Sequence, residues 1–275
     1  MGKNSAITAA GNGAGDTATD TERPFRRLRV WNGVMALLHF AQGVLMLLLS
    51  NDFSLPLTTS YLGAGPGSAM FGPVPTQVAS LRIGPMVALF LFISAAAHFL
   101  LTLPRVYQWY VSNLKKGINY ARWIEYSVSS SLMIVIIAML SGMYDLPSLI
   151  LIFFLNAMMI LFGLMMELHN QTTVRTSWTS FYFGCIAGLV PWVVIGMYFI
   201  GAAMETSGAI PTFVYFILGS LFVFFNIFAV NMVLQYKKIG PWRDYLFGEK
   251  AYIVLSLLAK SLLAWQVFSG TLRPQ

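Results

Sequence analysis

The sequence predicts an all-α membrane protein, a bundle of seven transmembrane helices with a cytoplasmic N-terminus. Three observations carry this prediction: an apolar composition, seven apolar stretches of membrane-spanning length, and basic residues gathered on one side of them. Of the 275 residues, 57% are hydrophobic and only 10% are charged, whereas soluble globular proteins are typically about 25% charged. Lipid is therefore the expected solvent. The net charge of +7 is assigned to membrane orientation rather than to nucleic-acid binding.

The spans follow from length and composition. A hydrocarbon core of about 30 Å needs roughly 20 apolar residues per helix. Several of the apolar stretches contain Gly or Pro, which membrane helices tolerate better than soluble ones. No repeat of fixed period is visible, so an inverted-repeat transporter has little support. One seven-helix domain is predicted over residues 28–275, with spans at about 29–50, 81–103, 121–142, 147–167, 181–203, 211–235 and 250–269.

Two segments lie outside these spans. Residues 1–27 are mostly small and polar, and we expect a disordered cytoplasmic tail. Residues 51–80 contain four prolines and are expected to form a long extracellular loop, partly ordered and with a hairpin as one possible form. Cys185 is the single cysteine, so no internal disulfide is expected.

The basic residues set the predicted orientation. Fourteen of the 17 Lys and Arg residues lie on the same side of the membrane as the N-terminus. Arg82 and Arg273 lie on the opposite side, and Lys260 lies inside the seventh span. Because Lys and Arg are enriched in cytoplasmic loops, we expect a multi-pass protein of the cell membrane with its N-terminus in the cytoplasm and its C-terminus outside.

Lys260 is expected close to the middle of the membrane. It lies about ten residues into its span, which is roughly 15 Å along a helix. A buried lysine requires a carboxylate partner, as in a structural ion pair, or covalent conversion. A lysine in such an environment is suited to form a Schiff base with an aldehyde. Tyr252 and Ser256 precede Lys260 at intervals of four residues and share its helix face.

Glu125, near the cytoplasmic end of the third span, is the natural counterion of Lys260. A carboxylate in a low-dielectric site is tolerated when it is paired or protonated. The alternative is a glutamate at a helix start that interacts with the helix dipole and with Arg122. Glu167 lies at the end of the fourth span, where we expect it to reach the interface.

His39 and His98 fall in the cytoplasmic halves of the first two spans. Either could be an ordinary hydrogen-bonding residue between helices. Two histidines on adjacent spans, at the level of a counterion, could instead form a proton-accepting cluster. A metal site is not expected, because these residues and His169 show no recognised ligand spacing.

Three segments carry a resemblance to a known family. RWIEYSVSSSLMIV, FGCIAGLVPW and EKAYIVLSLLAKSLLAWQVFSGTL resemble heliorhodopsin, and the resemblance runs from about residue 28 to the C-terminus. Heliorhodopsins are retinal-binding seven-helix proteins of rhodopsin type with an inverted orientation, which agrees with the count of basic residues. The family is dimeric and has a long first external loop, which corresponds here to residues 51–80.

The resemblance implies roles for individual residues. Lys260 would carry all-trans retinal as a protonated Schiff base, and Glu125 would be its counterion. Ser256 would neighbour the Schiff base, and His39 and His98 would belong to a polar cavity on the cytoplasmic side. The residues that fall where family members line the retinal are Asn156, Met159, Trp192 and Phe225.

The same comparison bears on ion transport. Proton pumps of the ordinary microbial type pass the proton along a chain of acids. Besides the counterion, they have a second acid on the third helix and another on the seventh. The corresponding positions here are Ile136 and Ser256. Ser129, one turn after Glu125, can form a hydrogen bond but cannot return a proton to the Schiff base. We therefore expect internal proton transfer toward the cytoplasmic side.

The resulting hypothesis is a light-sensing photoreceptor with a slow photocycle, no vectorial pumping and an unknown cytoplasmic partner. The alternative is a light-gated or light-driven proton conductor. A third hypothesis is a retinal-free receptor or transporter in which Lys260 and Glu125 form a structural pair. An enzyme is the weakest class, because no nucleophile–base arrangement, metal site or phosphate loop is visible. The basic loops could bind anionic lipid or an acidic protein, or only fix the orientation.

Overall fold

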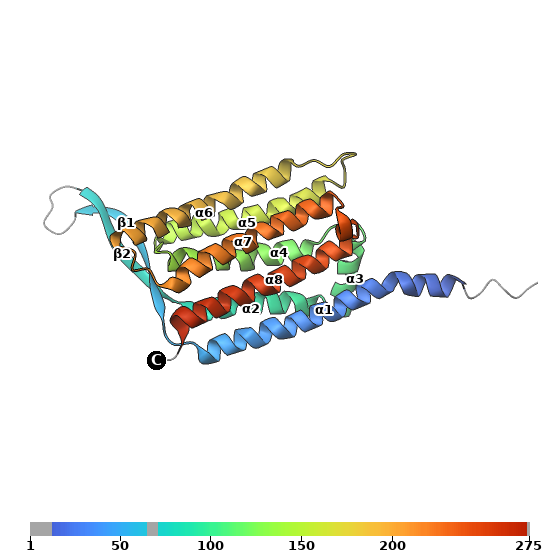
Figure 1. Cartoon of the computed structure of the whole chain (residues 1–275), viewed down its shortest axis with the longest axis horizontal. Coiled ribbons are helices and arrows are strands. Elements are labelled where there is room, and N and C mark those ends of the chain that lie inside the picture. The colour runs from blue at the N-terminus through green and yellow to red at the C-terminus, as the bar shows by residue number, and fades with distance from the viewer. Residues whose placement is uncertain (1–12, 65–70, 274–275) are drawn as a thin grey trace, which may run out of the picture.

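The computed structural model describes residues 13–64 and 71–273 and is mostly helical (Figure 1). Within these residues, seven helices are long and apolar enough to cross a membrane, and they run side by side as one bundle (Figure 1). The prediction of an all-α membrane protein with seven spans is therefore confirmed. The seven helices are α1 (Gly13–Leu49), α2 (Ile83–Leu100), α4 (Tyr120–Leu140), α5 (Leu146–His169), α6 (Thr179–Glu205), α7 (Thr212–Tyr236) and α8 (Tyr245–Val267).

One end of the bundle, called the hairpin end, carries two antiparallel strands. They are β1 (Ser54–Ala64) and β2 (Phe71–Arg82), with a bulge at Leu57/Thr58. The described part of the segment 51–80 is thus a hairpin. Thr58 N donates to Tyr144 O at 2.9 Å, which ties the hairpin to the turn between α4 and α5.

At the same end, Asn51 joins the end of α1 to the C-terminal turn Phe268–Leu272 that follows α8. Its backbone N donates to Leu272 O at 3.0 Å, and its side-chain Nδ2 lies 2.9 Å from Thr271 O. The first and last spans are therefore held together at the hairpin end.

The opposite end, called the α3 end, contains elements that the sequence analysis did not predict. A short helix, α3 (Pro104–Leu114), lies across it, and a 3-10 turn (Gly240–Arg243) joins α7 to α8. Pro104 lies in the first turn of α3, where its missing N–H costs nothing.

α1 begins at Gly13, well before the predicted start of the first span at about residue 29. Residues 1–12 lie outside the described residues, but residues 13–27, which were expected to belong to a disordered tail, are helical. Phe25 and Leu28 are buried against α3 residues such as Tyr110, and Glu22 lies 2.7 Å from Lys115. The prediction failed here because it lacked α3, whose apolar face gives the extension of α1 a surface to pack against.

Capping residues explain where three helices begin. Asn119, Asp145 and Asp244 accept a hydrogen bond from a backbone N–H in the first turn of α4, α5 and α8, respectively. α8 therefore starts at Tyr245, more than one turn before the predicted start at about residue 250. This earlier start brings Glu249 into the helix.

α4 lies at the centre of the bundle. In the most apolar 18-residue stretch of α4, 72% of the residues are buried, against 17% in the corresponding stretch of α7. Toward the hairpin end, Ile136 and Ile137 of α4 pack with Leu91 of α2 and Leu263 of α8 in one buried apolar cluster. The outer faces of α6 and α7 expose large apolar side chains, as expected of helices that contact lipid.

Candidate functional site

The structure brings Lys260 of α8 and Glu125 of α4 together in the middle of the bundle. Lys260 Nζ lies 2.7 Å from Glu125 Oε1, and the two side chains are only 4% and 7% exposed. A buried ammonium group is stable there because the carboxylate compensates its charge. The alternative pairing of Glu125 with Arg122 is wrong, since Arg122 binds two other carboxylates.

Glu125 has a second partner that the sequence analysis missed. Ser94 Oγ of α2 lies 2.7 Å from the same Oε1 atom and donates a hydrogen bond to it. On the other side of the pair, Lys260 Nζ lies 5.1 Å from the centre of the Tyr126 ring. A serine within an apolar stretch shows no pattern that predicts this role, which depends on the contact between α2 and α4.

A largely apolar cavity of about 360 Å³ adjoins the Lys260 amine. Its lining comes from α4, α5, α6, α7 and α8. Its volume lies within the range of about 300–1,000 Å³ that is usual for small-molecule sites. The predicted site residues that line it are Lys260, Ser256, Ser129, Met159, Trp192 and Phe225.

The cavity walls suit a planar apolar molecule. Trp192 of α6 packs edge-on against Phe225 of α7, with ring centres 5.5 Å apart. One turn before Trp192 on α6, the Met159 side chain of α5 packs so closely on Gly188 that a Cβ atom there would overlap it. Asn156 does not line the cavity. Its Nδ2 instead lies 2.9 Å from Ser130 Oγ and 3.0 Å from Ser131 Oγ, behind the wall.

Two hydroxyl groups beside the amine lack partners. Within the described part of the chain, the buried Oγ atoms of Ser129 and Ser256 have no hydrogen-bond partner. Buried polar groups are rarely left in this state unless a ligand or a water bonds to them. An apolar cavity that ends at a primary amine flanked by two hydroxyls therefore fits an elongated apolar aldehyde held through Lys260.

His39 of α1 and His98 of α2 form a stacked pair, with ring centres 5.8 Å apart and planes 7° apart. His98 Nδ1 lies 2.7 Å from Asn32 Oδ1, whereas neither ring nitrogen of His39 has a partner among the described residues. Ser94 precedes His98 by one turn of α2 and shares its face. The pair thus lies next to the Ser94–Glu125 contact and outside the apolar cavity.

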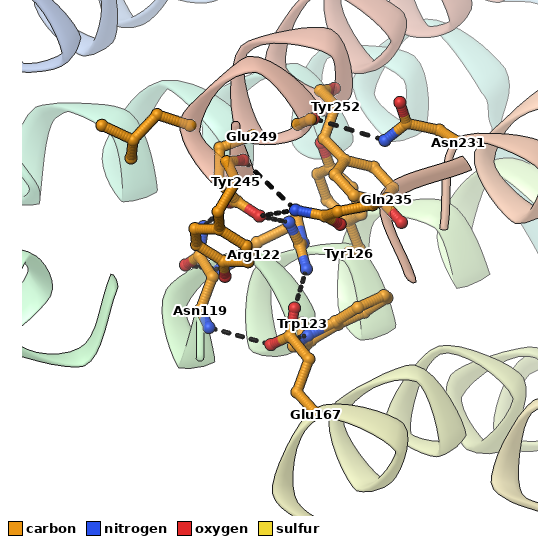
Figure 2. Close-up of polar contacts among 12 residues, drawn as sticks. Asn119, Arg122, Trp123, Tyr126, Glu167, Asn231, Gln235, Tyr245, Glu249 and Tyr252 are labelled. Carbon is orange, nitrogen blue, oxygen red and sulfur yellow. Dashed lines mark hydrogen bonds and ion pairs between the residues drawn. The ribbon is translucent and has the colours of Figure 1, made fainter. Parts of the chain in front are cut away.

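A second buried charged group, called the Arg122 cluster, consists of Arg122 of α4, Glu167 of α5 and Glu249 of α8 (Figure 2). Arg122 Nη2 lies 2.5 Å from Glu167 Oε1, and Arg122 Nη1 bonds to Glu249 Oε1. Glu167 was expected to reach the interface, but its side chain is only 2% exposed. The expectation was wrong because helix packing encloses this end of α5.

Neutral donors complete the Arg122 cluster. Asn119 N and Trp123 Nε1 donate to Glu167 at 2.9 and 2.7 Å, and Asn119 Nδ2 donates to Glu249 at 2.6 Å. α4 and α5 approach closely here, since a Cβ atom at Gly163 would overlap the Trp123 ring. Three spans are therefore joined around one guanidinium.

A seven-helix membrane bundle in which a lysine of the last span meets a carboxylate beside an apolar cavity defines the class of retinal-binding rhodopsins. The comparison with known families agrees, because the heliorhodopsin model matches residues 28–272. The chain belongs to the heliorhodopsin family. It is thus a light-responsive membrane protein of microbial rhodopsin type, in a photoreceptor family that binds retinal. No curated protein matches the chain.

Proposed function

We propose that this protein is a light sensor that holds all-trans retinal on Lys260, passes a proton internally and does not pump ions. The observation that carries the proposal is the buried Lys260–Glu125 pair at the end of an apolar cavity. The bound retinal would supply light absorption and an isomerisation next to Lys260 Nζ. The protein's part is to hold the charge, exclude water and receive the proton.

Each wall of the site has a part in this proposal. Glu125 would stabilise the positive charge at Nζ, with Ser94 fixing its carboxylate. Ser129 and Ser256 would orient the groups next to Nζ through their unpartnered hydroxyls. The apolar walls, from Met159, Trp192 and Phe225, would restrict the retinal to one orientation. Asn156 would support the α4 wall through its hydrogen bond to Ser130.

The proton would leave Nζ toward the stacked pair of His39 and His98. His39 is the better acceptor on geometry, because both of its ring nitrogens lack a partner within the described residues. Ser94 lies between this pair and Glu125, and its hydroxyl can relay a proton. Light should therefore reduce the visible absorption band, and the band should return slowly and reversibly.

Pumping is disfavoured by the half of the bundle toward the hairpin end. Within the described residues, its acids are Asp52, Asp145 and Glu205, which lie at helix ends or in the connecting segment. Asp145 already caps α5. Between them and Lys260 lies the apolar packing around Ile136 and Leu263. A proton would therefore leave and return through the α3 end.

We further propose that the α3 end faces the cytoplasm, because the basic residues are concentrated there. A conformational change would be passed to a cytoplasmic protein at that end. A homodimer is proposed from the family resemblance. The bilayer itself is the partner that the seven apolar helices require.

Illumination of vesicles that contain the retinal-loaded protein tests the proposal against its main alternative. We expect a visible absorption band and no sustained light-dependent change in external pH. A pH change that a protonophore abolishes would establish a proton conductor instead. The absence of any visible band after incubation with retinal would favour a retinal-free receptor or transporter.

Glu125→Gln should shift the visible band strongly and make the protonated form at Nζ less stable. The reason is that it removes the negative charge 2.7 Å away. Spectra recorded across a pH series would measure both effects. Glu205→Gln, at an exposed position at the end of α6, is the matched control and should leave the spectrum unchanged. An unaltered spectrum in Glu125→Gln would mean that another group is the counterion.

His39→Gln and His98→Gln should each change the rate at which Nζ loses its proton, without removing the colour. The reason is that the two rings are in contact and form the nearest proton acceptors beyond Ser94. Flash photolysis measures the rate, and His169→Gln, at the end of α5, serves as the control. Wild-type kinetics in both variants would contradict the assignment.

A further inference from the structure

The Arg122 cluster contains more acid than its base can neutralise. We propose that Glu167 and Glu249 share one proton, exchange it with water at the α3 end, and return a proton to Lys260 Nζ through Tyr252 and Ser256. This inference rests on the proposed function, since it requires Nζ to lose a proton in the light. The His39–His98 pair would receive the departing proton, and the Arg122 cluster would supply the returning one.

The Arg122 cluster has an excess of negative charge when both of its carboxylates are ionised. One guanidinium faces two carboxylates, and all three side chains are at most 4% exposed. Among the described residues, no other Lys or Arg is bonded to Glu167 or Glu249. With both carboxylates ionised, the cluster would carry an uncompensated negative charge inside the membrane, which is costly. One shared proton removes that surplus.

The groups that face the two carboxylates are donors or aromatic rings rather than a second cation. Asn119 and Trp123 of α4 donate to them, and Gln235 of α7 lies 3.5 Å from Glu249 Oε1. Tyr245 of α8 adds a buried phenol oxygen that has no partner within the described residues. Tyr236 of α7 and Tyr245 both line a polar cavity at the α3 end.

The Arg122 cluster has access to water. A polar cavity of about 400 Å³ opens at the α3 end, and Glu167 and Tyr245 line it together with the exposed residues Lys238 and Arg243. Roomy polar cavities of this kind hold water. The cluster therefore borders solution on one side, although its charged side chains are buried.

One face of α8 connects the Arg122 cluster to Lys260. Arg122 Cζ lies 4.0 Å from the centre of the Tyr252 ring, and Tyr252, Ser256 and Lys260 follow one another at one-turn intervals on the same face of α8. All three line the large apolar cavity. The buried hydroxyls of Tyr252 and Ser256 have no partner among the described residues. Their backbone positions are about 6 Å apart along the helix axis, so the proposed relay uses bridging water between the polar groups.

The proton balance of this route is simple. The shared carboxylic acid O–H gives up its proton, the hydroxyls of Tyr252 and Ser256 relay it with bridging water, and Nζ gains it. The carboxylate pair then takes a proton from the α3-end cavity. The histidine pair releases its own proton on the same side. No charge crosses the apolar half, so the cycle is closed and moves no net proton across the membrane.

Flash photolysis of the retinal-loaded full chain tests the relay. In Tyr252→Phe and in Ser256→Ala, the return of the proton to Nζ should slow by about tenfold or more. In Tyr252→Phe, the loss of the proton from Nζ should keep the wild-type rate. Tyr252→Phe keeps the ring on Arg122, so it removes the hydroxyl alone. Ser127→Ala, a buried serine of α4 that bonds to Ile124 O, is the matched control and should recover as wild type.

Infrared spectroscopy of the dark protein tests the reservoir independently of light and of retinal. We expect a protonated-carboxyl C=O band that shifts in D₂O and disappears in Glu249→Gln or Glu167→Gln. The absence of such a band, or wild-type recovery in both Tyr252→Phe and Ser256→Ala, overturns this inference. A chain that shows no visible band with retinal contradicts the proposed function instead, so the two failures are distinguishable.

Discussion

Lys260→Ala should abolish the visible absorption of the protein incubated with all-trans retinal. The primary amine of Lys260 is buried at the end of the apolar cavity, with Glu125 Oε1 2.7 Å away and the hydroxyl-bearing Ser256 also in the cavity wall. Alanine offers no atom to which an aldehyde can bond. Spectra of wild type and variant, prepared in parallel in membranes, make the comparison.

A loss of colour must be separated from a loss of folding. Lys260→Ala leaves Glu125 as an unpaired buried charge, which costs roughly 3–5 kcal/mol. The double variant Lys260→Ala/Glu125→Gln removes that charge and should fold while remaining colourless. In the wild type, hydroxylamine should bleach the band in the light. A visible band in the folded double variant would mean that retinal is not attached through Lys260.

Arg122→Leu should strongly destabilise the folded protein. It leaves both Glu167 and Glu249 buried without their cation, and the loss of a partner from one buried pair alone costs roughly 3–5 kcal/mol. We expect a marked fall in the thermal unfolding midpoint, measured in detergent or in nanodiscs. The triple variant Arg122→Leu/Glu167→Gln/Glu249→Gln should recover much of the loss.

Arg82→Leu is the matched control for this experiment. Arg82 forms an ion pair with Asp52, but its side chain is 57% exposed and that of Asp52 is 88% exposed. Exposed pairs contribute about 0–1 kcal/mol, so the unfolding midpoint should hardly move. Equal effects of Arg122→Leu and Arg82→Leu would show that the Arg122 cluster does not hold α4, α5 and α8 together.

The spans were predictable because each is a long apolar run whose solvent is lipid. The residues at which the helices begin and end were less predictable. The start of α8 depends on Asp244 as a cap, which a hydropathy pattern does not register. The N-terminal extension of α1 depends on the burial of Phe25 and Leu28 against α3. Such contacts between distant segments have no local signal in the sequence.

The residues of the functional site were likewise predictable only in part. Lys260 and Glu125 were predictable because ionisable residues inside spans are rare and need partners. The Arg122 cluster also had a signal, since Glu249 lies eleven residues before Lys260 and shares its helix face, as Arg122 does with Glu125. That signal required the true start of α8. Ser94 and Asn32 could not have been selected, because only the packing of α2 against α4 and α1 gives them partners.

The hydrogen bonds at the hairpin end have a mechanical consequence. Asn51 fastens the first span to the last, and Thr58 fastens the hairpin to the turn between α4 and α5. These hydrogen bonds restrain the hairpin end. A displacement of α8 at Lys260 should therefore tilt the helices about that end and move their opposite ends, at the α3 end, by a larger distance. A fluorescent or spin label on the exposed Lys238 would therefore move farther in the light than one on the hairpin.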